Sequence, residues 1–229
     1  MELAIESVGA EAQPLAILDD FAPDPEALRD FAATARFGDA RNHYPGVRAE
    51  LPGDYLSIQL PLIAAAVAQA FGRSGPIEVI DASFSIVCTP ADMLSVPQRL
   101  PHCDAFTPDR IALVHYLSAG HGGTAFFRHR ATGFETVTEE RRDLYFRQLE
   151  TELRYGGPPA SGYVAGDTAL FECIRIAEAR CNRALLYRSS NLHSGAIASG
   201  APLSADPRDG RLTVTAFLSI ERATAAAPR

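Results

Sequence analysis

The sequence predicts a mainly β fold, a β-sandwich or jelly roll with helices packed on one sheet. Two stretches with helical periodicity occupy the first third of the chain. At least six short runs rich in β-branched and aromatic residues follow, with one further helix inserted among them. Many short strands with a few helices bury their apolar faces in packed layers, which is the arrangement of sandwiches and jelly rolls.

The N-terminal third is predicted to form one strand and two helices. Residues 15–18 are an apolar run that leads into a turn. Asp24 is typical of an N-cap, and the apolar positions after it predict a helix over residues 25–37. A second helix is expected from residue 55 or 60 to residue 71, with Pro61 tolerated only in its first turn.

The rest of the chain alternates strands with turns. Residues 138–154 form the inserted helix, because opposite charges recur there at helical spacing. In the strand at 110–118, odd-numbered residues share one face and even-numbered residues the other. Strands are predicted over residues 77–89, 110–118, 124–128, 168–177, 184–188 and 212–220.

Length and charge limit the class of protein. We expect one domain over residues 1–229, with residues 222–229 as a frayed tail, since all-β domains of this size are common. The net charge of −7 argues against nucleic-acid binding, which needs a basic face. No apolar run is long enough for a membrane span. The expected partner is a small molecule, peptide or protein substrate, and a homodimer is left open.

The cysteines and the first residues indicate a cytoplasmic protein. Cys88, Cys103, Cys173 and Cys181 lack the close spacing of metal or redox motifs. The first residues carry neither a basic nor an apolar signal region. We therefore expect reduced thiols, with two disulfides in a secreted protein as the alternative.

One pair of residues has the spacing of a metal site. His102 and Asp104 lie two residues apart, and on an extended segment both side chains point to the same side. Roughly 0.7 such pairs are expected by chance in this composition, so the pair needs its context. His193 is the candidate third ligand. Two histidines and one carboxylate hold ferrous iron by one face and leave the other positions open.

Several further motifs occur along the chain in the same order as in a known enzyme family. The chain resembles the iron(II)- and 2-oxoglutarate-dependent dioxygenases, specifically their prolyl-4-hydroxylase-like branch, from about residue 15 to residue 221. The motifs that carry the resemblance are Ile17-Leu18-Asp19-Asp20-Phe21, His102-Cys103-Asp104, Tyr116-Leu117-Ser118, Gly122-Gly123-Thr124, Phe126-Phe127, His193 and Gly210-Arg211-Leu212-Thr213.

The resemblance implies a fold, a chemistry and a set of roles. The fold would be a double-stranded β-helix, and His102, Asp104 and His193 would be the catalytic metal ligands. Arg211 would bind the distal carboxylate of 2-oxoglutarate, for which a guanidinium is apt. Thr213 and Tyr116 would line the same co-substrate site. With Fe(II), 2-oxoglutarate and O2, the enzyme would hydroxylate an unactivated C–H bond and release succinate and CO2.

Two positions depart from the family pattern. The family places its basic residue about ten positions after the second histidine, whereas Arg211 lies 18 positions after His193. Arg208 therefore stays an alternative, and Arg211 could instead form a structural ion pair with Asp209 or Glu221. Ser118 stands where the family commonly has asparagine. The carboxylate of Asp104 would occupy the metal position that a halide would need. We therefore expect hydroxylation and not halogenation.

Two other functional classes stay open. A cupin-like metalloenzyme would use the same three ligands without 2-oxoglutarate, and a non-catalytic jelly-roll binding module would use none of them. The substrate could be a peptidyl residue, an amino acid or a small metabolite. Residues 42–48 and 128–133 are the candidate substrate contacts. His115, His121 and His129 are expected not to be ligands, and Cys103 is expected to point away from the metal.

Overall fold

The structure is a computed structural model that describes residues 2–40, 44–118, 120, 122–201 and 203–220. These residues form two antiparallel sheets and three α-helices, which confirms the predicted mainly β class. The predicted frayed tail, residues 222–229, lies outside the described residues. So do Asn42 and His43 of the candidate contact loop, and His121.

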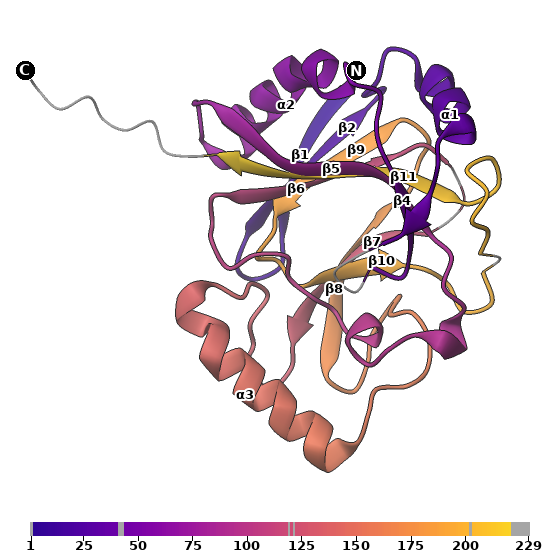
Figure 1. Cartoon of the computed structure of the whole chain (residues 1–229). Helices are drawn as coiled ribbons and strands as arrows, with labels where there is room; N and C mark the ends of the chain where they lie inside the picture. Colours follow the sequence, from indigo (N-terminus) through magenta and orange to yellow (C-terminus); the bar gives the residue numbers. More distant parts are fainter. Residues whose placement is uncertain (1, 41–43, 119, 121, 202, 221–229) are drawn as a thin grey trace, which may run out of the picture.

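The larger sheet has eight strands in the order β1-β2-β9-β6-β11-β5-β4-β3, and the smaller has three in the order β10-β7-β8 (Figure 1). The larger sheet contains β1 (Glu2–Val8), β2 (Gln13–Asp19), β3 (Gly38–Asp39), β4 (Gly46–Ala49), β5 (Ile77–Val87), β6 (Arg110–Tyr116), β9 (Arg183–Arg188) and β11 (Arg211–Ile220). The smaller contains β7 (Gly123–His129), β8 (Phe171–Glu178) and β10 (His193–Ala196). The helices are α1 (Pro25–Thr34), α2 (Tyr55–Phe71) and α3 (Glu139–Gly156), with two 3-10 turns at Ala91–Met93 and Pro97–Arg99.

The two sheets are stacked, with a helical layer outside each of them. Helices α1 and α2 lie on the outer side of the larger sheet, and α3 lies beyond the smaller sheet (Figure 1). A third apolar cluster, which includes Tyr116, Phe126 and Tyr187, fills the space between the sheets. In β6, Ile111 and Leu113 pack toward the helices and Ala112 and Tyr116 toward the smaller sheet, as the alternating pattern predicts.

The helix ends follow local chemistry, with one correction. Asp24 caps α1, because its Oδ1 accepts a hydrogen bond from the Ala27 N–H at 2.9 Å. Helix α1 ends at Thr34, three residues before the predicted end. Pro61 lies inside α2, beyond the first turn, so the prediction that it would be confined there is wrong. The helix continues past it because Ile63 and Val67 are buried against the larger sheet.

Four strands were not predicted: β1, β3, β4 and β10. Strand β1 is mostly exposed and pairs along its whole length with β2. Strands β3 and β4 fall in a stretch predicted as loop, where β4 adds to the edge of β5. Strand β10 has the sequence His-Ser-Gly-Ala and forms beside β7. Each has weak propensity of its own, so its strand conformation comes from its partner.

The cysteines are thiols, as expected: Cys88, Cys103, Cys173 and Cys181 are all described and all free. Among the described residues, no helix combines the length and the hydropathy needed to cross a bilayer.

A buried histidine joins three parts of the larger sheet's helical side. His115 is fully buried, its Nδ1 lies 2.9 Å from the Tyr55 hydroxyl, and its Nε2 lies 3.1 Å from Asn182 Oδ1. Asn182 Oδ1 also accepts from the Ala22 N–H, so it is an acceptor, and His115 must donate from Nε2 and accept at Nδ1. His115 is thus a structural residue, which agrees with its predicted role outside the metal site.

This network predicts a loss of stability in mild acid. Burial lowers the pKa of His115 from 6.5 to about 4. Between these values the unfolded chain binds a proton that the folded protein does not. Stability therefore rises with pH from about 4 to about 6.5, and this one residue contributes about 3 kcal/mol across that window. Urea unfolding at several pH values should show this slope, and His115→Gln should flatten it. An unchanged slope in the variant would contradict the assignment.

Candidate metal centre

Backbone pairing brings the two predicted histidine ligands together. His102 follows the 3-10 turn at Pro97–Arg99, and its N–H donates to the His193 carbonyl at 2.9 Å. The His193 N–H donates back to the His102 carbonyl at 2.8 Å. The two imidazole centroids are 4.5 Å apart. Residues separated by 91 positions in the sequence thus lie directly opposite each other as an antiparallel pair.

Asp104 completes the cluster. Its N–H donates to the Ser189 carbonyl at 2.7 Å, which fixes the segment after His102. Asp104 Oδ1 lies 3.6 Å from His102 Nε2, and Oδ2 lies 3.4 Å from His193 Nε2. The candidate donor atoms of the three residues all lie within 4.8 Å of one another. Among the described residues this is the one group of three or more such side chains found.

The protonation of His193 suits a metal ligand. Its Nδ1 lies 2.9 Å from the Asn191 carbonyl, which can only accept, so Nδ1 carries the proton. Nε2, the nitrogen left for a metal, faces the Asp104 carboxylate. Nε2 and the carboxylate oxygen, 3.4 Å apart, therefore converge on the place where a metal cation would be held. The Tyr187 ring, 4.8 Å from the His193 ring in a T-shaped contact, fixes the imidazole from the other side.

The centre is open on one side. The side chain of His193 is 8% exposed and that of Asp104 is 19% exposed, whereas that of His102 is 55% exposed. Partial burial of the His102 ring, together with the charge of His193, still lowers the pKa of His102, against the opposing effect of Asp104. His102 is therefore a neutral imidazole at neutral pH, which is the form that binds metal.

The predicted co-substrate residues lie between the two sheets. Arg211, at the start of β11, is 6% exposed, and its Nη2 donates to the Gly123 carbonyl of β7 at 2.9 Å. Its guanidinium lies 5.4 Å from the Tyr116 ring centroid. The Tyr116 hydroxyl is 2.6 Å from Thr124 Oγ1. Thr213 donates its hydroxyl to the Ser85 carbonyl at 3.1 Å. Arg211 thus spans from the larger to the smaller sheet.

Strand register relates Arg211 to the histidines. In the β10–β7 pair, His193 lies opposite Phe126 and Ala196 lies opposite Gly123. The carbonyl that Arg211 contacts is thus three residues along β7 from the position of His193, or about 10 Å at the usual strand rise. Arg208, the alternative, is exposed in the turn before β11, where its N–H donates to Asp206 Oδ1.

Two residues of the candidate contact loop lie near Arg211. Burial raises the pKa of Tyr44, and the nearby charges of Arg211 and Arg48 oppose that rise. The Tyr44 hydroxyl and Arg48 Nε are buried and form no hydrogen bond of regular geometry among the described residues, although Ser85 and Thr213 lie near the hydroxyl. Arg48 stacks on the Tyr44 ring at 4.8 Å and pairs with Asp81 at 3.5 Å. Sequence alone indicated this loop but not its place beside Arg211.

Other residues singled out in the sequence serve the fold. Arg128 binds Glu135 and Glu172, and Arg130 pairs with Asp167. His129 is buried, with its Nε2 2.8 Å from Glu152 Oε2. The two arginines of this candidate contact segment are thus engaged in ion pairs, and His129 is hydrogen-bonded within the fold. Cys103 packs into the apolar cluster under α3, as predicted, and burial raises the pKa of its thiol to about 12.

Sequence reasoning missed Tyr187, Ser189 and Asn191. Tyr187 contacts the His193 ring, Ser189 holds Asp104, and Asn191 orients His193. Two of these contacts use main-chain carbonyls, which leave no mark in a sequence. The sequence signal in this region was His193 itself, which was predicted as a ligand, and it gave no role to its three neighbours.

Comparison with known proteins gives a family and a set of distant structural likenesses. Residues 1–218 match the model of a family of unknown function, DUF6445. No protein of curated function matches the chain. A 2OG-Fe(II) oxygenase family oxidoreductase from Burkholderia pseudomallei is 11% identical, with a TM-score of 0.44 over 91% of this chain and 85% of that one. An N-substituted L-amino acid dioxygenase from Burkholderia ambifaria is 12% identical, with a TM-score of 0.45 over 91% and 83%.

Proposed function

The chain belongs to a family of unknown function, DUF6445, and we propose that it is an iron(II)- and 2-oxoglutarate-dependent dioxygenase. We place it in the prolyl-4-hydroxylase-like branch, on a double-stranded β-helix core. The observation that carries the proposal is the convergence of His102, Asp104 and His193, with His193 Nε2 facing the Asp104 carboxylate.

The donor set fits ferrous iron. Two imidazole nitrogens and one carboxylate on one side are the ligands of mononuclear iron oxygenases and leave positions for a co-substrate and oxygen. Asn191 fixes the tautomer and orientation of His193, and Ser189 holds the backbone of Asp104. When bound, iron would let O2 oxidise both 2-oxoglutarate, to succinate and CO2, and a substrate C–H bond, to C–OH, with one oxygen atom of O2 entering each product.

The residues between the sheets fit the far end of 2-oxoglutarate. The acid has four C–C bonds of about 1.5 Å each. With a metal–oxygen bond of about 2 Å and a charged hydrogen bond of about 2.8 Å, it reaches about 10 Å. The distance along β7 from the residue opposite His193 to Gly123, whose carbonyl Arg211 contacts, is of the same size. The Tyr44 hydroxyl, which lies near Arg211, Ser85 and Thr213, would supply a further donor there. Thr213 has to release the Ser85 carbonyl to bind the carboxylate.

The substrate is proposed as an amino acid, a peptidyl residue or another small metabolite. His102 is the exposed ligand, so substrate approaches from its side. Because Asp104 occupies the third protein position, the proposed reaction is hydroxylation and not halogenation.

Anaerobic titration of the iron(II)-loaded protein with 2-oxoglutarate tests the proposal. A keto acid that chelates iron through its carboxylate and keto oxygens produces a weak visible charge-transfer band. We expect this band in the wild type and its loss in His193→Ala. Succinate, which lacks the keto group, is the matched control and should give no band.

Other outcomes lead to the other classes. Iron binding without the band would overturn 2-oxoglutarate dependence and favour a cupin-like metalloenzyme. No iron binding at all would favour a jelly-roll binding module whose histidines are structural.

A further inference from the structure

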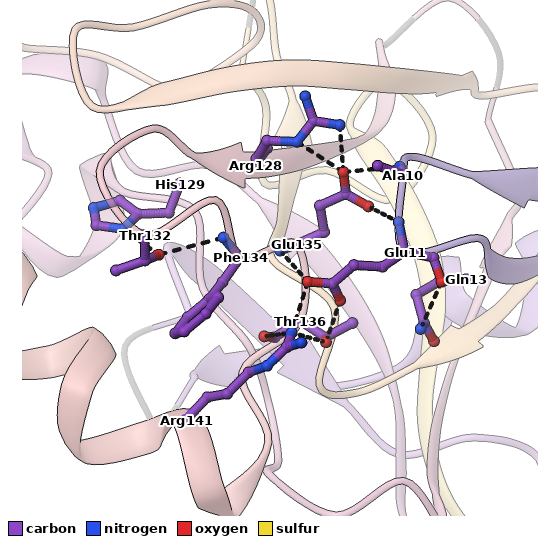
Figure 2. Close-up of polar contacts among 10 residues, drawn as sticks. All are labelled: Ala10, Glu11, Gln13, Arg128, His129, Thr132, Phe134, Glu135, Thr136 and Arg141. Atoms are coloured by element: carbon purple, nitrogen blue, oxygen red, sulfur yellow. Dashed lines mark hydrogen bonds and ion pairs between the residues drawn. The ribbon is translucent and has the colours of Figure 1, made fainter.

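A dense polar cluster joins the N-terminal hairpin to the chain before α3. We call it the hairpin clamp and define it as Ala10, Glu11, Arg128, Glu135, Thr136 and Arg141 (Figure 2). Its members come from the β1–β2 turn, from β7 and from residues 135–141. The clamp contains charged groups that are largely buried, because Glu135 is 3% exposed and the side chain of Glu11 is 19% exposed.

One half of the clamp is the Glu135 carboxylate. Oε1 accepts from the Ala10 N–H at 3.0 Å, and Oε2 accepts from the Glu11 N–H at 2.9 Å. Arg128 donates to Oε1 from Nε at 2.8 Å and from Nη2 at 2.5 Å. Gly9 allows this approach, since its φ is +68° and a Cβ there would lie 2.0 Å from Glu135 Oε2.

The other half is the Glu11 carboxylate, which binds the segment that contains Glu135. It accepts from the Glu135 N–H at 3.1 Å, from Thr136 Oγ1 at 2.5 Å and from Arg141 Nη1 at 2.6 Å. Each glutamate therefore binds the backbone beside the other, as Figure 2 shows. Reciprocal, charge-assisted bonds of this kind fix two segments in one register.

The clamped segment lies against the strand that carries His193. The Leu192 N–H donates to the Glu135 carbonyl at 2.8 Å, and the Val137 N–H donates to the Ser190 carbonyl at 2.8 Å. Thr136 forms a bridge with Asn191. The Asn191 carbonyl is the acceptor that orients His193 through Nδ1. A continuous series of bonds thus runs from the hairpin turn, through Glu135, to the imidazole.

We propose that the hairpin clamp is a positioning device for His193, an inference that rests on the proposed function. Without the clamp, residues 135–137 lose their anchor on the hairpin, and residues 190–192 lose their fixed neighbour. His193 then samples orientations in which Nε2 no longer faces Asp104. Glu11 and Glu135 are accordingly positioning residues that act through the backbone.

The test compares Glu11→Gln and Glu135→Gln with Glu6→Gln. Glu6 lies on the same hairpin and forms a bidentate pair with Arg175 of β8, at 2.8 and 2.9 Å, so its loss removes a similar ion pair. Amide hydrogen exchange is measured in the metal-free protein by NMR. We expect the Leu192 and His193 amides to lose protection in the clamp variants and to keep it in Glu6→Gln. Glu11→Gln keeps the Arg128–Glu135 ion pair, so it can test the clamp alone if Glu135→Gln does not fold.

Metal affinity gives the second readout. Cobalt(II) titration should show binding weaker by about 10- to 100-fold in the clamp variants, which is the usual cost of losing a partner that orients a ligand. The visible cobalt bands should shift in the same variants. Unchanged exchange and unchanged affinity, or changes equal to those of Glu6→Gln, would overturn the clamp. If the wild type binds no metal, the proposed function fails, and hydrogen exchange alone decides the clamp.

Discussion

Asp104→Ala is expected to abolish metal-dependent turnover. Asp104 is the carboxylate of the cluster, with Oδ1 and Oδ2 facing the Nε2 atoms of His102 and His193. Without it, two imidazoles face each other with no negative charge to balance a divalent cation. The affinity for iron(II) should fall by more than the roughly 10- to 100-fold that loss of an outer partner costs. Calorimetric titration of iron(II) under anaerobic conditions measures the change.

The neighbouring residue provides the control. Cys103 packs into the apolar cluster under α3, so Cys103→Ala should lower stability while the metal affinity stays at the wild-type value. Unaltered iron binding in Asp104→Ala would remove the carboxylate from the ligand set. His102→Ala should behave as Asp104→Ala does.

Arg211→Ala is expected to raise the KM for 2-oxoglutarate strongly and to leave iron binding in place. A buried guanidinium that binds a carboxylate through charged hydrogen bonds contributes about 1.5–3 kcal/mol per bond. Two such bonds correspond to at least a hundredfold rise in KM by the usual conversion. Steady-state kinetics at saturating iron measure it.

Arg208→Ala is the matched control, because Arg208 is exposed in the turn before β11. It should leave the KM for 2-oxoglutarate unchanged. The reverse result, with the effect in Arg208→Ala and none in Arg211→Ala, would mean that the wrong arginine is assigned. Since Arg211 also holds the Gly123 carbonyl, Arg211→Lys tests whether charge without the bidentate geometry is enough.

Local signals account for what the sequence predicted well. Three features could be predicted from residues a few positions apart in the sequence. They are the Asp24 cap, the two faces of β6 and the packing of Cys103 under α3, away from the metal ligands. Strands β1 and β10 could not, because their residues become strands only beside β2 and β7. Pro61 is a case in which a local signal misleads. Proline disfavours the interior of a helix, but the burial of α2 outweighs that cost.

The candidate site likewise contains residues that the sequence could predict and contacts that it could not. The His-x-Asp spacing and the late histidine were enough to predict the three side chains that the structure brings together. The proposed preference for Arg211 over Arg208 rests on the burial of Arg211, which no spacing reveals. The contacts around His193 could not be predicted, because Asn191 and Glu135 act through carbonyls and N–H groups that every residue has.

The unequal exposure of the two histidines has a kinetic consequence. An arriving cation or a chelator meets His102 first, since that side chain faces solvent while His193 is enclosed by the sheets. Loading would then begin at the outer ligand and finish at the inner one, and extraction by a chelator would also begin at the outer ligand. His102 is therefore the ligand whose substitution should change the rates of metal uptake and of removal by a chelator most directly.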